Sequence, residues 1–378
     1  MACDNYITTP ELRDAAISDL KGCSVIGVDT EGDSLFSYQE RVSLIQISGE
    51  ETHYIFDPLL LDTVQPLAAL LEDRSILKVF HGADYDLVSL KRDFHFNIGP
   101  VFDTALAARA VGIENFSLQD LVARYFQVTL SKKFQKANWS LRPLPKEQLD
   151  YAYRDTAYLV SLYRILKKEV EEKGRSDQIA EECRLLERIT WNGKKFEPND
   201  YLRIKGARTL SPTSQQVLRE LAVVRDRLAR RWNRPPFKVI SNRSLMTIAK
   251  SLPQDEDALR RLFPKETSSV NKNRTIWLEA VSSGLATDVP LPVREGRSSM
   301  QLAPCEEKLL SRLKAWRNRQ AKTEGVEPAM VIPSAILKEI AQKRPATIEV
   351  LNAIPSLRPW QIRRYGMPLI KEISHQLP

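Results

Sequence analysis

Residues 24–31 read SVIGVDTE, a short run rich in β-branched residues that ends in two carboxylates. Three similar runs follow, each bounded by turn residues: VSLIQIS (42–48), THYIFD (52–57) and ILKVFH (76–81). Runs of this length and composition are typical of strands. The first three runs follow one another through short connections, which predicts antiparallel neighbours, whereas a helical pattern at 66–73 precedes the fourth, so the fourth can join parallel. We therefore predict a mixed sheet covered by helices.

Helical patterns continue after these strands. Helices are expected at 83–94, 103–112, 117–126, 146–173 and 177–191, with the loop KANWSLRPLP before the fourth of them. The α/β domain is therefore predicted to end near residue 195. The chain of 378 residues is long enough for two or three domains, so further domains are expected behind it.

The remainder of the chain contains an internal repeat. When the sequence is shifted by 92 residues without a gap, matching residues keep register over more than forty positions, among them Leu218 with Leu310, Arg225 with Arg317, Pro236 with Pro328, Leu245 with Leu337 and Pro253 with Pro345. We predict two copies of one small helical domain, the first over 208–284 and the second over 302–376. The segment 285–301 between them is rich in Ser, Gly and Pro and is predicted to be a linker.

The charge of the chain is divided between its halves. Residues 1–200 carry a net charge of −8 and residues 201–378 carry +16. So basic a second half indicates a polyanionic partner, most simply nucleic acid, although a well-solvated helical surface is the alternative. Two segments, RRWNRPPFK (230–238) and WRNRQAK (316–322), combine cations with aromatic residues that can stack on bases. For each of them, a solvated helix with one core tryptophan is the competing interpretation.

Other classes of protein are disfavoured by what the sequence lacks. No stretch approaches the roughly 20 uncharged apolar residues of a membrane helix, and the amino terminus has neither the basic region nor the apolar core of a signal peptide. We therefore expect a cytoplasmic protein. The four cysteines lie far apart without a CxxC pair, and only four histidines are present, so neither a disulfide framework nor a structural zinc site is expected.

Acidic residues that could share one site lie in three segments of the predicted α/β domain. Asp29 and Glu31 alternate along the predicted strand and so point to one face, where two like charges favour a bound cation, although solvated acids at a strand end are the alternative. Asp86 lies in the first turn of the helix after ILKVFH, a position that the helix dipole favours without any catalytic role. Tyr151 and Asp155 are four residues apart in a predicted helix and therefore share a face.

Taken together, the three segments resemble a known family. DTE at a strand end, HxxxxDL some fifty residues later and YxxxD near 150 resemble the three exonuclease motifs of the DEDD superfamily, in the subgroup whose third motif carries tyrosine. NWSLRPL and the tandem helical repeats resemble the ribonuclease D family, and the repeats resemble HRDC domains. The resemblance covers nearly the whole chain. It implies an α/β, ribonuclease H-like mixed-sheet exonuclease domain over 1–195, followed by two small all-α HRDC-like domains.

The resemblance also implies the site. Asp29, Glu31, Asp86 and Asp155 are expected to be catalytic and to hold two divalent metal ions, Mg²⁺ or Mn²⁺, which suits hard oxygen ligands. Tyr151 beside them is expected to orient the attacking water, since a free phenol of pKa ~10 is a poor base.

The second motif leaves one choice open. Asp84 is a rival of Asp86, and we prefer Asp86 because His81 and Leu87 fix the register of HxxxxDL. A secondary role for Asp84 stays possible, and His81 is expected to be structural or to face the substrate.

The implied function is a 3′–5′ exoribonuclease that releases 5′-mononucleotides. Its expected partners are precursor tRNA 3′ ends and other small structured RNAs, with no membrane, and it is expected to be a monomer. The alternatives are a DNA 3′–5′ exonuclease and a non-catalytic nucleic-acid-binding adaptor. The absence of GxxxxGK[ST] disfavours a helicase motor, and the complete set of acids disfavours the adaptor.

Overall fold

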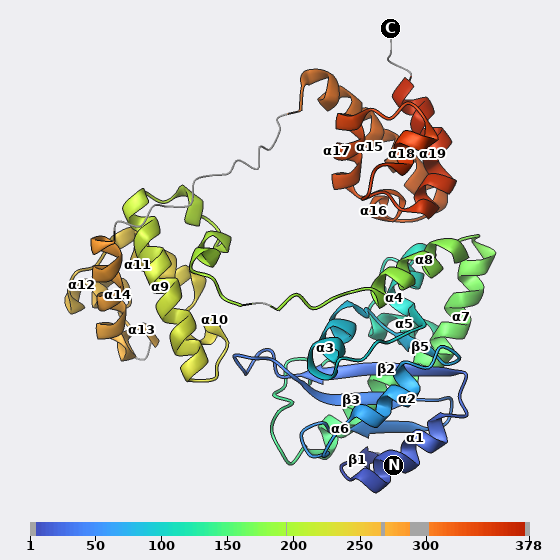
Figure 1. The fold of residues 1–378 in the computed structure, drawn as a ribbon, viewed down its shortest axis with the longest axis horizontal. Coiled ribbons are helices and arrows are strands. Elements are labelled where there is room, and N and C mark those ends of the chain that lie inside the picture. The colour runs from blue at the N-terminus through green and yellow to red at the C-terminus, as the bar shows by residue number, and fades with distance from the viewer. Residues whose placement is uncertain (1–4, 194, 266–268, 288–301, 375–378) are drawn as a thin grey trace. The chain divides into compact units, whose positions relative to one another are not determined.

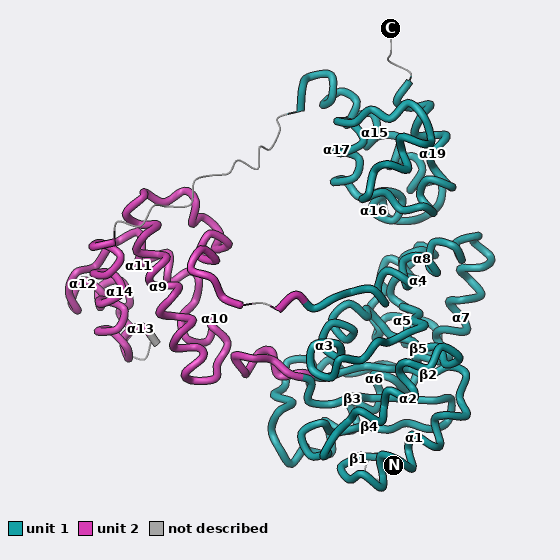
Figure 2. Tube along the Cα trace, in the orientation of Figure 1, with its two compact units in different colours: residues 1–31, 42–191, 301–378 teal, residues 32–41, 192–300 magenta. Residues whose placement is uncertain are grey.

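The chain forms two compact units. The computed structural model describes residues 5–193, 195–265, 269–287 and 302–374. Unit 1 comprises residues 1–31, 42–191 and 301–378, and unit 2 comprises residues 32–41 and 192–300 (Figure 2). Most of the predicted linker, 288–301, and the end of the second predicted repeat, 375–376, lie outside the described residues.

Within its described residues, unit 1 contains a six-stranded sheet. Figure 1 shows how the labelled strands lie among the helices. Its strands are β1 (Tyr6–Ile7), β2 (Val25–Gly32), β3 (Val42–Ser48), β4 (His53–Phe56), β5 (Leu77–Phe80) and β6 (Val101–Asp103), in the order β1-β4-β3-β2-β5-β6. The pair β3–β4 is antiparallel, whereas β2–β5, β5–β6 and β1–β4 are parallel. The predicted mixed sheet is therefore confirmed. Strands β1 and β6 were not predicted, because two or three residues are too few to show a period.

Alternation along β2 sends its residues to two different layers. Ile26 and Val28 are fully buried in an apolar cluster with residues of α1 (Pro10–Leu20), α2 (Ala68–Leu71) and α3 (Asp84–Phe94). The short 3₁₀ helix η1 (Gln65–Leu67) directly precedes α2. Val25 packs instead against the cluster on the opposite face, with α4 (Thr104–Ala110), α5 (Leu118–Phe126), α7 (Leu159–Glu172) and α8 (Ser176–Glu187). The sheet therefore lies between two layers of helices.

The prediction of one long helix over 146–173 is wrong, because the structure has two helices there. They are α6 (Lys146–Ala157) and α7, with a break at Tyr158. The carbonyl of Thr156 accepts a hydrogen bond of 2.9 Å from the Ser48 hydroxyl on β3, which draws this carbonyl toward the sheet at the break. Gly27 permits this close approach, since a Cβ at that position would lie 2.9 Å from Cβ of Leu159.

The predicted repeat is confirmed by two matching sets of helices. The first set is α9 (Pro212–Arg231), α10 (Pro236–Val239), α11 (Asn242–Ser251), α12 (Glu256–Leu262), α13 (Ser269–Lys272) and α14 (Arg274–Ala286). The second is α15 (Pro304–Glu324), α16 (Pro328–Val331), α17 (Ser334–Lys343), α18 (Ile348–Asn352) and α19 (Pro359–Ser374). Both bounds of α10 and α11 recur 92 residues later in α16 and α17.

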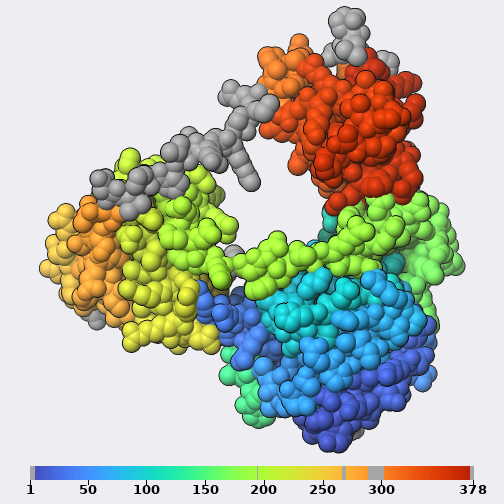
Figure 3. Space-filling view, viewed as in Figure 1, coloured from blue at the N-terminus to red at the C-terminus, as the bar shows by residue number. Residues whose placement is uncertain are grey.

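Each repeat has its own apolar core. In unit 2, Trp277 and Leu221 are fully buried, and Tyr201 from the short 3₁₀ helix η2 (Pro198–Arg203) joins them, followed by η3 (Ala207–Thr209). The core of the first repeat therefore begins ahead of residue 208. Trp316 and Tyr365 form the corresponding centre of the second repeat, and the surface of each repeat can be followed by colour in Figure 3.

Candidate active site

Three of the predicted acidic residues come together at the end of β2. Carboxylate oxygens of Asp29, Glu31 and Asp155 all lie within 4.8 Å of one another. The alternation of β2 gives Asp29 and Glu31 the face that α6 covers, and the lack of a side chain at Gly27 lets the α6–α7 junction approach that face. Local strand geometry and one glycine thus position these three carboxylates.

Asp86 reaches the same strand end from the other helical layer. It is only 7% exposed on α3, and its Oδ1 accepts a hydrogen bond of 2.5 Å from the hydroxyl of Thr30, which lies between Asp29 and Glu31. The charge of Asp86 also acts on both Asp29 and Glu31. The structure therefore gathers all four predicted acids.

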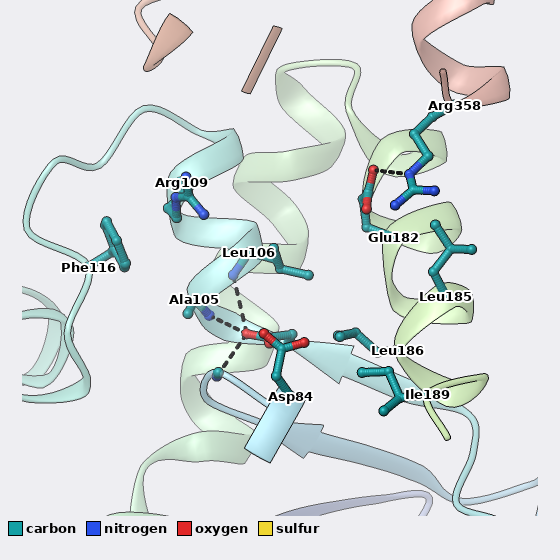
Figure 4. A pocket seen from close by; sticks show the side chains of 12 residues that line it. Asp84, Ala105, Leu106, Arg109, Phe116, Glu182, Leu185, Leu186, Ile189 and Arg358 are labelled. Carbon is teal, nitrogen blue, oxygen red and sulfur yellow. Dashed lines mark hydrogen bonds and ion pairs between the residues drawn. The ribbon is translucent and has the colours of Figure 1, made fainter. Parts of the chain in front are cut away.

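Asp84 has a different environment. Its exposed side chain points into a cavity of about 460 Å³ together with Arg109, Leu106 and Leu185, and the pair Glu182 and Arg358 closes one side (Figure 4). Asp84 is not among the acids that act electrostatically on the cluster at β2, and its own pKa is raised by partial desolvation of its carboxyl group and by the charge of Asp103. The two acids at the start of α3 thus face different surroundings.

Burial and mutual repulsion disfavour the charged form of the clustered acids. Burial is the larger cause and raises the pKa of Asp29 and Glu31 well above the usual range, and their acidic neighbours raise it further. Burial likewise raises the pKa of Asp86 and of Asp155 to about 7. A cluster that is this costly to ionise by itself is a site that a bound cation would stabilise.

Tyr151 is fixed beside the cluster. Its ring contacts Phe134 and Trp139, at centroid distances of 5.9 and 6.0 Å, and the phenol lies close enough to Asp155 for each group to shift the pKa of the other. Burial, followed by the charge of Asp155, raises the pKa of the phenol. Tyr151 is therefore a buried phenol beside the cluster, and its raised pKa favours the protonated form.

Arg142 holds the segment that supports Tyr151, and sequence reasoning did not identify it. Its Nε and Nη2 donate to the two carboxylate oxygens of the buried Asp57, at 2.5 and 2.7 Å. Nη1 donates to the carbonyl of Trp139 at 2.6 Å, and Nη2 also donates to the carbonyl of Ser43 at 2.9 Å. This bidentate pair ties the loop that carries Trp139 to β3 and to the end of β4. The only signal in the sequence was an Arg-Pro pair within NWSLRPL.

Asp103 was also missed, and it caps two helices at once. Its Oδ1 accepts from the backbone N–H of Gly82 at 3.0 Å and of Ala105 at 2.8 Å, and its Oδ2 accepts from Ala83 at 2.9 Å. One buried carboxylate thus fixes the start of α3, which carries Asp86, relative to the start of α4. His81 lies nearby with Nδ1 3.0 Å from the hydroxyl of Thr104 and is not part of the acidic cluster.

The two basic aromatic segments have different environments. Trp316 is only 4% exposed, and the buried Arg317 donates to the carbonyl of Ile332 and the hydroxyl of Ser334. The interpretation of this segment as a base-stacking surface is wrong, because its tryptophan belongs to the core. In the first repeat, by contrast, Trp232 is 37% exposed and Phe237 is 54% exposed.

Comparison with known proteins agrees with this architecture. Residues 5–171 match the family model described as a 3′–5′ exonuclease, and residues 214–281 and 306–373 each match the HRDC domain. Ribonuclease D of Desulfotalea psychrophila is 30% identical over 344 residues, which cover 90% of this chain and 91% of that protein. Ribonuclease D of Pseudomonas paraeruginosa is 27% identical over 98% of this chain and 99% of its own length.

Solved structures show the same fold. The crystal structure of Escherichia coli RNase D matches with a TM-score of 0.70 at 22% identity and covers 99% of both chains. The catalytic core of RRP6 from Trypanosoma brucei matches with a TM-score of 0.66 at 29% identity, over 75% of this chain and 80% of that one.

The fold, the acidic cluster and the two helical repeats define the class of 3′–5′ exonucleases that carry HRDC domains. Within that class the chain belongs to the ribonuclease D family, and its reaction is 3′–5′ exoribonucleolytic hydrolysis. Among the helices of the described residues, none is long and apolar enough to cross a membrane.

Proposed function

We propose that this enzyme shortens RNA from the 3′ end at the cluster of Asp29, Glu31, Asp86 and Asp155, with two divalent ions, Mg²⁺ or Mn²⁺, as cofactors. The observation that carries the proposal is the approach of three carboxylates, those of Asp29, Glu31 and Asp155, to within 4.8 Å of one another, with Asp86 beside them. The donor set offers only hard oxygen atoms, which fits Mg²⁺ and Mn²⁺ better than zinc. When bound, such ions lower the pKa of a water nucleophile and stabilise the departing 3′ oxygen.

Each of the site residues has a separate proposed role. Asp29, Glu31 and Asp155 would hold the ion on the side of the attacking water, and Asp86 would hold the other, with Asp29 shared between them. Tyr151 orients the attacking water through a hydroxyl that stays protonated, because burial and the neighbouring carboxylates raise its pKa. Phe134 and Trp139 contact the ring that carries this hydroxyl and support its position beside the cluster.

The proposed products are 5′-mononucleotides, and the proposed substrates are the 3′ ends of precursor tRNA and other small structured RNAs. The Escherichia coli structure with the same fold is described as an exoribonuclease involved in structured RNA processing, which supports this class of substrate. We further propose that the enzyme acts in the cytoplasm as a monomer.

The test compares two Asp→Asn substitutions in the full-length chain. Asp29→Asn removes a negative charge from the cluster at constant size, whereas Asp84→Asn makes the same change in the neighbouring cavity. We expect Asp29→Asn to slow Mg²⁺-dependent release of nucleotides by about 10³-fold or more, because preorganised charge supplies most of the transition-state stabilisation. Asp84→Asn should retain most of the activity.

Both variants are measured on end-labelled RNA and DNA of one sequence, with Mg²⁺ and with Mn²⁺. Retained activity with normal metal dependence in Asp29→Asn would remove this residue from the site. Equal rates on RNA and DNA would favour a general exonuclease, and no release by the wild-type chain with either ion would favour the adaptor.

A further inference from the structure

Gln46 in the middle of β3 carries a primary amide that is fully buried. Neither its Nε2 nor its Oε1 has a hydrogen-bond partner among the described residues. Buried polar groups nearly always have such a partner, and a buried amide without one lowers the stability of the fold. A side chain that is unfavourable for folding in this way points to a role in a nearby functional site.

Gln46 faces the layer of helix α6. Its partner in the register of β3 and β4 is Ile55, which belongs with Leu44 and Tyr151 to the apolar cluster under α6. Residues that are paired directly across two strands share a face of the sheet, and so do residues two apart along one strand. The amide therefore lies on the same face as the carboxylate of Asp29.

The register of β2 and β3 makes Gln46 the cross-strand neighbour of Asp29. The two strands are adjacent in the sheet, and the connection 33–41 is too short for a parallel crossover, so they run antiparallel. Oγ of Ser48 would lie 2.8 Å from a Cβ at Gly27, which places these two residues opposite each other. The next pair on this face, two residues along each strand, is Asp29 with Gln46. The Cβ atoms of such a pair are about 4.5–5.5 Å apart, which brings the amide within reach of the carboxylate.

Asp29 differs from two other acids of the cluster in its support. The hydroxyl of Thr30 donates to Asp86, and the phenol of Tyr151 lies beside Asp155. Burial and the neighbouring acids raise the pKa of Asp29, and among the described residues only the backbone of Thr30 lowers it. Yet Asp29 is the carboxylate that the two ions are proposed to share, so its orientation is the most constrained. The amide on β3 is the side-chain donor next to it.

A neutral amide suits this position better than a cationic side chain does. A carboxylate offers about four acceptor sites on its two oxygen atoms, so a carboxylate shared by two ions can still accept a hydrogen bond. A lysine or arginine would neutralise the carboxylate and repel the ions, whereas an amide stabilises the charged form without adding charge. Hydrogen-bond donors behind a metal ligand commonly fix its orientation in this way.

We propose that Gln46 is a positioning residue of the exonuclease site: in the metal-bound enzyme its Nε2 donates to the carboxylate of Asp29 and holds it in the orientation that both ions share. The inference rests on the proposed function, which makes Asp29 a metal ligand. The competing explanation is that Gln46 only fills space under α6. A packing residue affects stability, whereas a positioning residue affects metal binding, so the two explanations predict different results.

The test measures metal binding and stability of the full-length protein without RNA. Gln46→Met keeps the length of the side chain and removes both polar atoms. Ser43→Ala is the matched control, because it removes another buried polar atom without a partner in the described structure from the same strand. By alternation Ser43 lies on the opposite face, with Ile45 and Ile47. Mg²⁺ affinity is determined by isothermal titration, and melting temperatures are recorded in EDTA and in Mg²⁺.

We expect the two substitutions to have similar effects on stability and different effects on metal binding. In EDTA both variants should melt at or above the temperature of the wild type, because each loses an unpartnered buried group. Gln46→Met should bind Mg²⁺ about 10- to 100-fold more weakly, the usual effect of losing a group that orients a metal ligand. The rise in melting temperature on adding Mg²⁺ should shrink in the same variant. Ser43→Ala should match the wild type in both measurements of metal binding.

Three outcomes would overturn the inference. Wild-type Mg²⁺ affinity in Gln46→Met would leave Gln46 a packing residue, and an equal loss of affinity in Ser43→Ala would show that any change in β3 disturbs the site. A Gln46→Met protein that melts well below the wild type in EDTA would show that the amide has a structural role. Failure of the proposed function would appear differently, as an absence of Mg²⁺ binding in the wild type itself.

Discussion

Thr30 offers the sharpest test of how the acidic cluster is built. The alternation of β2 gives Thr30 the same layer as Ile26 and Val28, which is the layer of α3, and there its hydroxyl donates to Asp86 at 2.5 Å. Asp86 is thus held from the sheet, while Asp29 approaches from the opposite face. We predict that Thr30→Val, which keeps the shape and removes the donor, weakens binding of the divalent ion at Asp86.

The size of the effect follows from the type of hydrogen bond. A hydrogen bond to a charged group contributes about 1.5–3 kcal/mol, and about 1.4 kcal/mol corresponds to a factor of ten. The apparent Mg²⁺ affinity of Thr30→Val should therefore fall about 10- to 100-fold, which is also the usual cost of losing a group that orients a metal ligand. Thr30→Ser keeps a hydroxyl and should retain most of the affinity.

Metal binding is measured by isothermal titration of the full-length protein without RNA, and the Mg²⁺ concentration that gives half-maximal hydrolysis is measured in parallel. Melting curves in EDTA serve as the folding control. If Thr30→Val binds Mg²⁺ and turns over RNA like the wild type, the orientation of Asp86 does not depend on this hydroxyl. If Thr30→Ser fails equally, packing of the methyl group is responsible and the hydrogen-bond argument is wrong.

Three further predictions concern the hydroxyl of Tyr151, the pKa of the clustered acids and the docking of the second repeat. Tyr151→Phe should slow single-turnover hydrolysis about tenfold or more and spare Mn²⁺ affinity, because a positioning hydroxyl is lost and no carboxylate is; an unchanged rate at every pH would make the hydroxyl a bystander. In EDTA, the melting temperature should fall as pH rises from about 5 to 8. Folding raises the pKa of Asp86 and Asp155 from 3.8 to about 7, so these groups lose their protons at a lower pH in the unfolded chain than in the folded one. Mg²⁺ should suppress the trend, and a melting temperature that rises with pH in EDTA would contradict the prediction. Arg175→Met should weaken docking of the second repeat by roughly 3 kcal/mol, because Glu324 loses a buried partner; faster hydrogen exchange in α15 and α16 would report this, and unchanged exchange would count against the pair.

Much of the fold could be predicted from local pattern. The runs of Val and Ile at 42–48 and 76–81 are long enough to show strand composition, and the helices of the repeats show themselves through the 92-residue register. The break at Tyr158 could not be predicted, because it coincides with a hydrogen bond between Ser48 and Thr156, which are 108 residues apart in the chain. Nothing in the local sequence at 146–173 interrupts the helical pattern.

The site divides in the same way. Spacing alone placed Asp29 with Glu31 and Tyr151 with Asp155, because strand and helix periods are local properties. The supports of the site are long-range contacts, such as Arg142 on Asp57. An arginine or aspartate with such a role has no periodicity that would distinguish it from a surface residue, so only the folded chain reveals it.

The net charge of the second half overstates the positive charge that is available to bind a partner. In unit 1, Arg358 lies 3.6 Å from Glu182, and Arg363 lies 3.3 Å from Glu181, so cations of the second repeat neutralise acids of α8. Part of the positive charge that indicated nucleic acid thus attracts the acidic exonuclease domain of the same chain. The first repeat has the larger excess of positive charge, and guanidinium groups such as that of Arg231 are exposed there beside Trp232. The two repeats are similar in sequence, but the first should therefore attract a polyanion more strongly than the second.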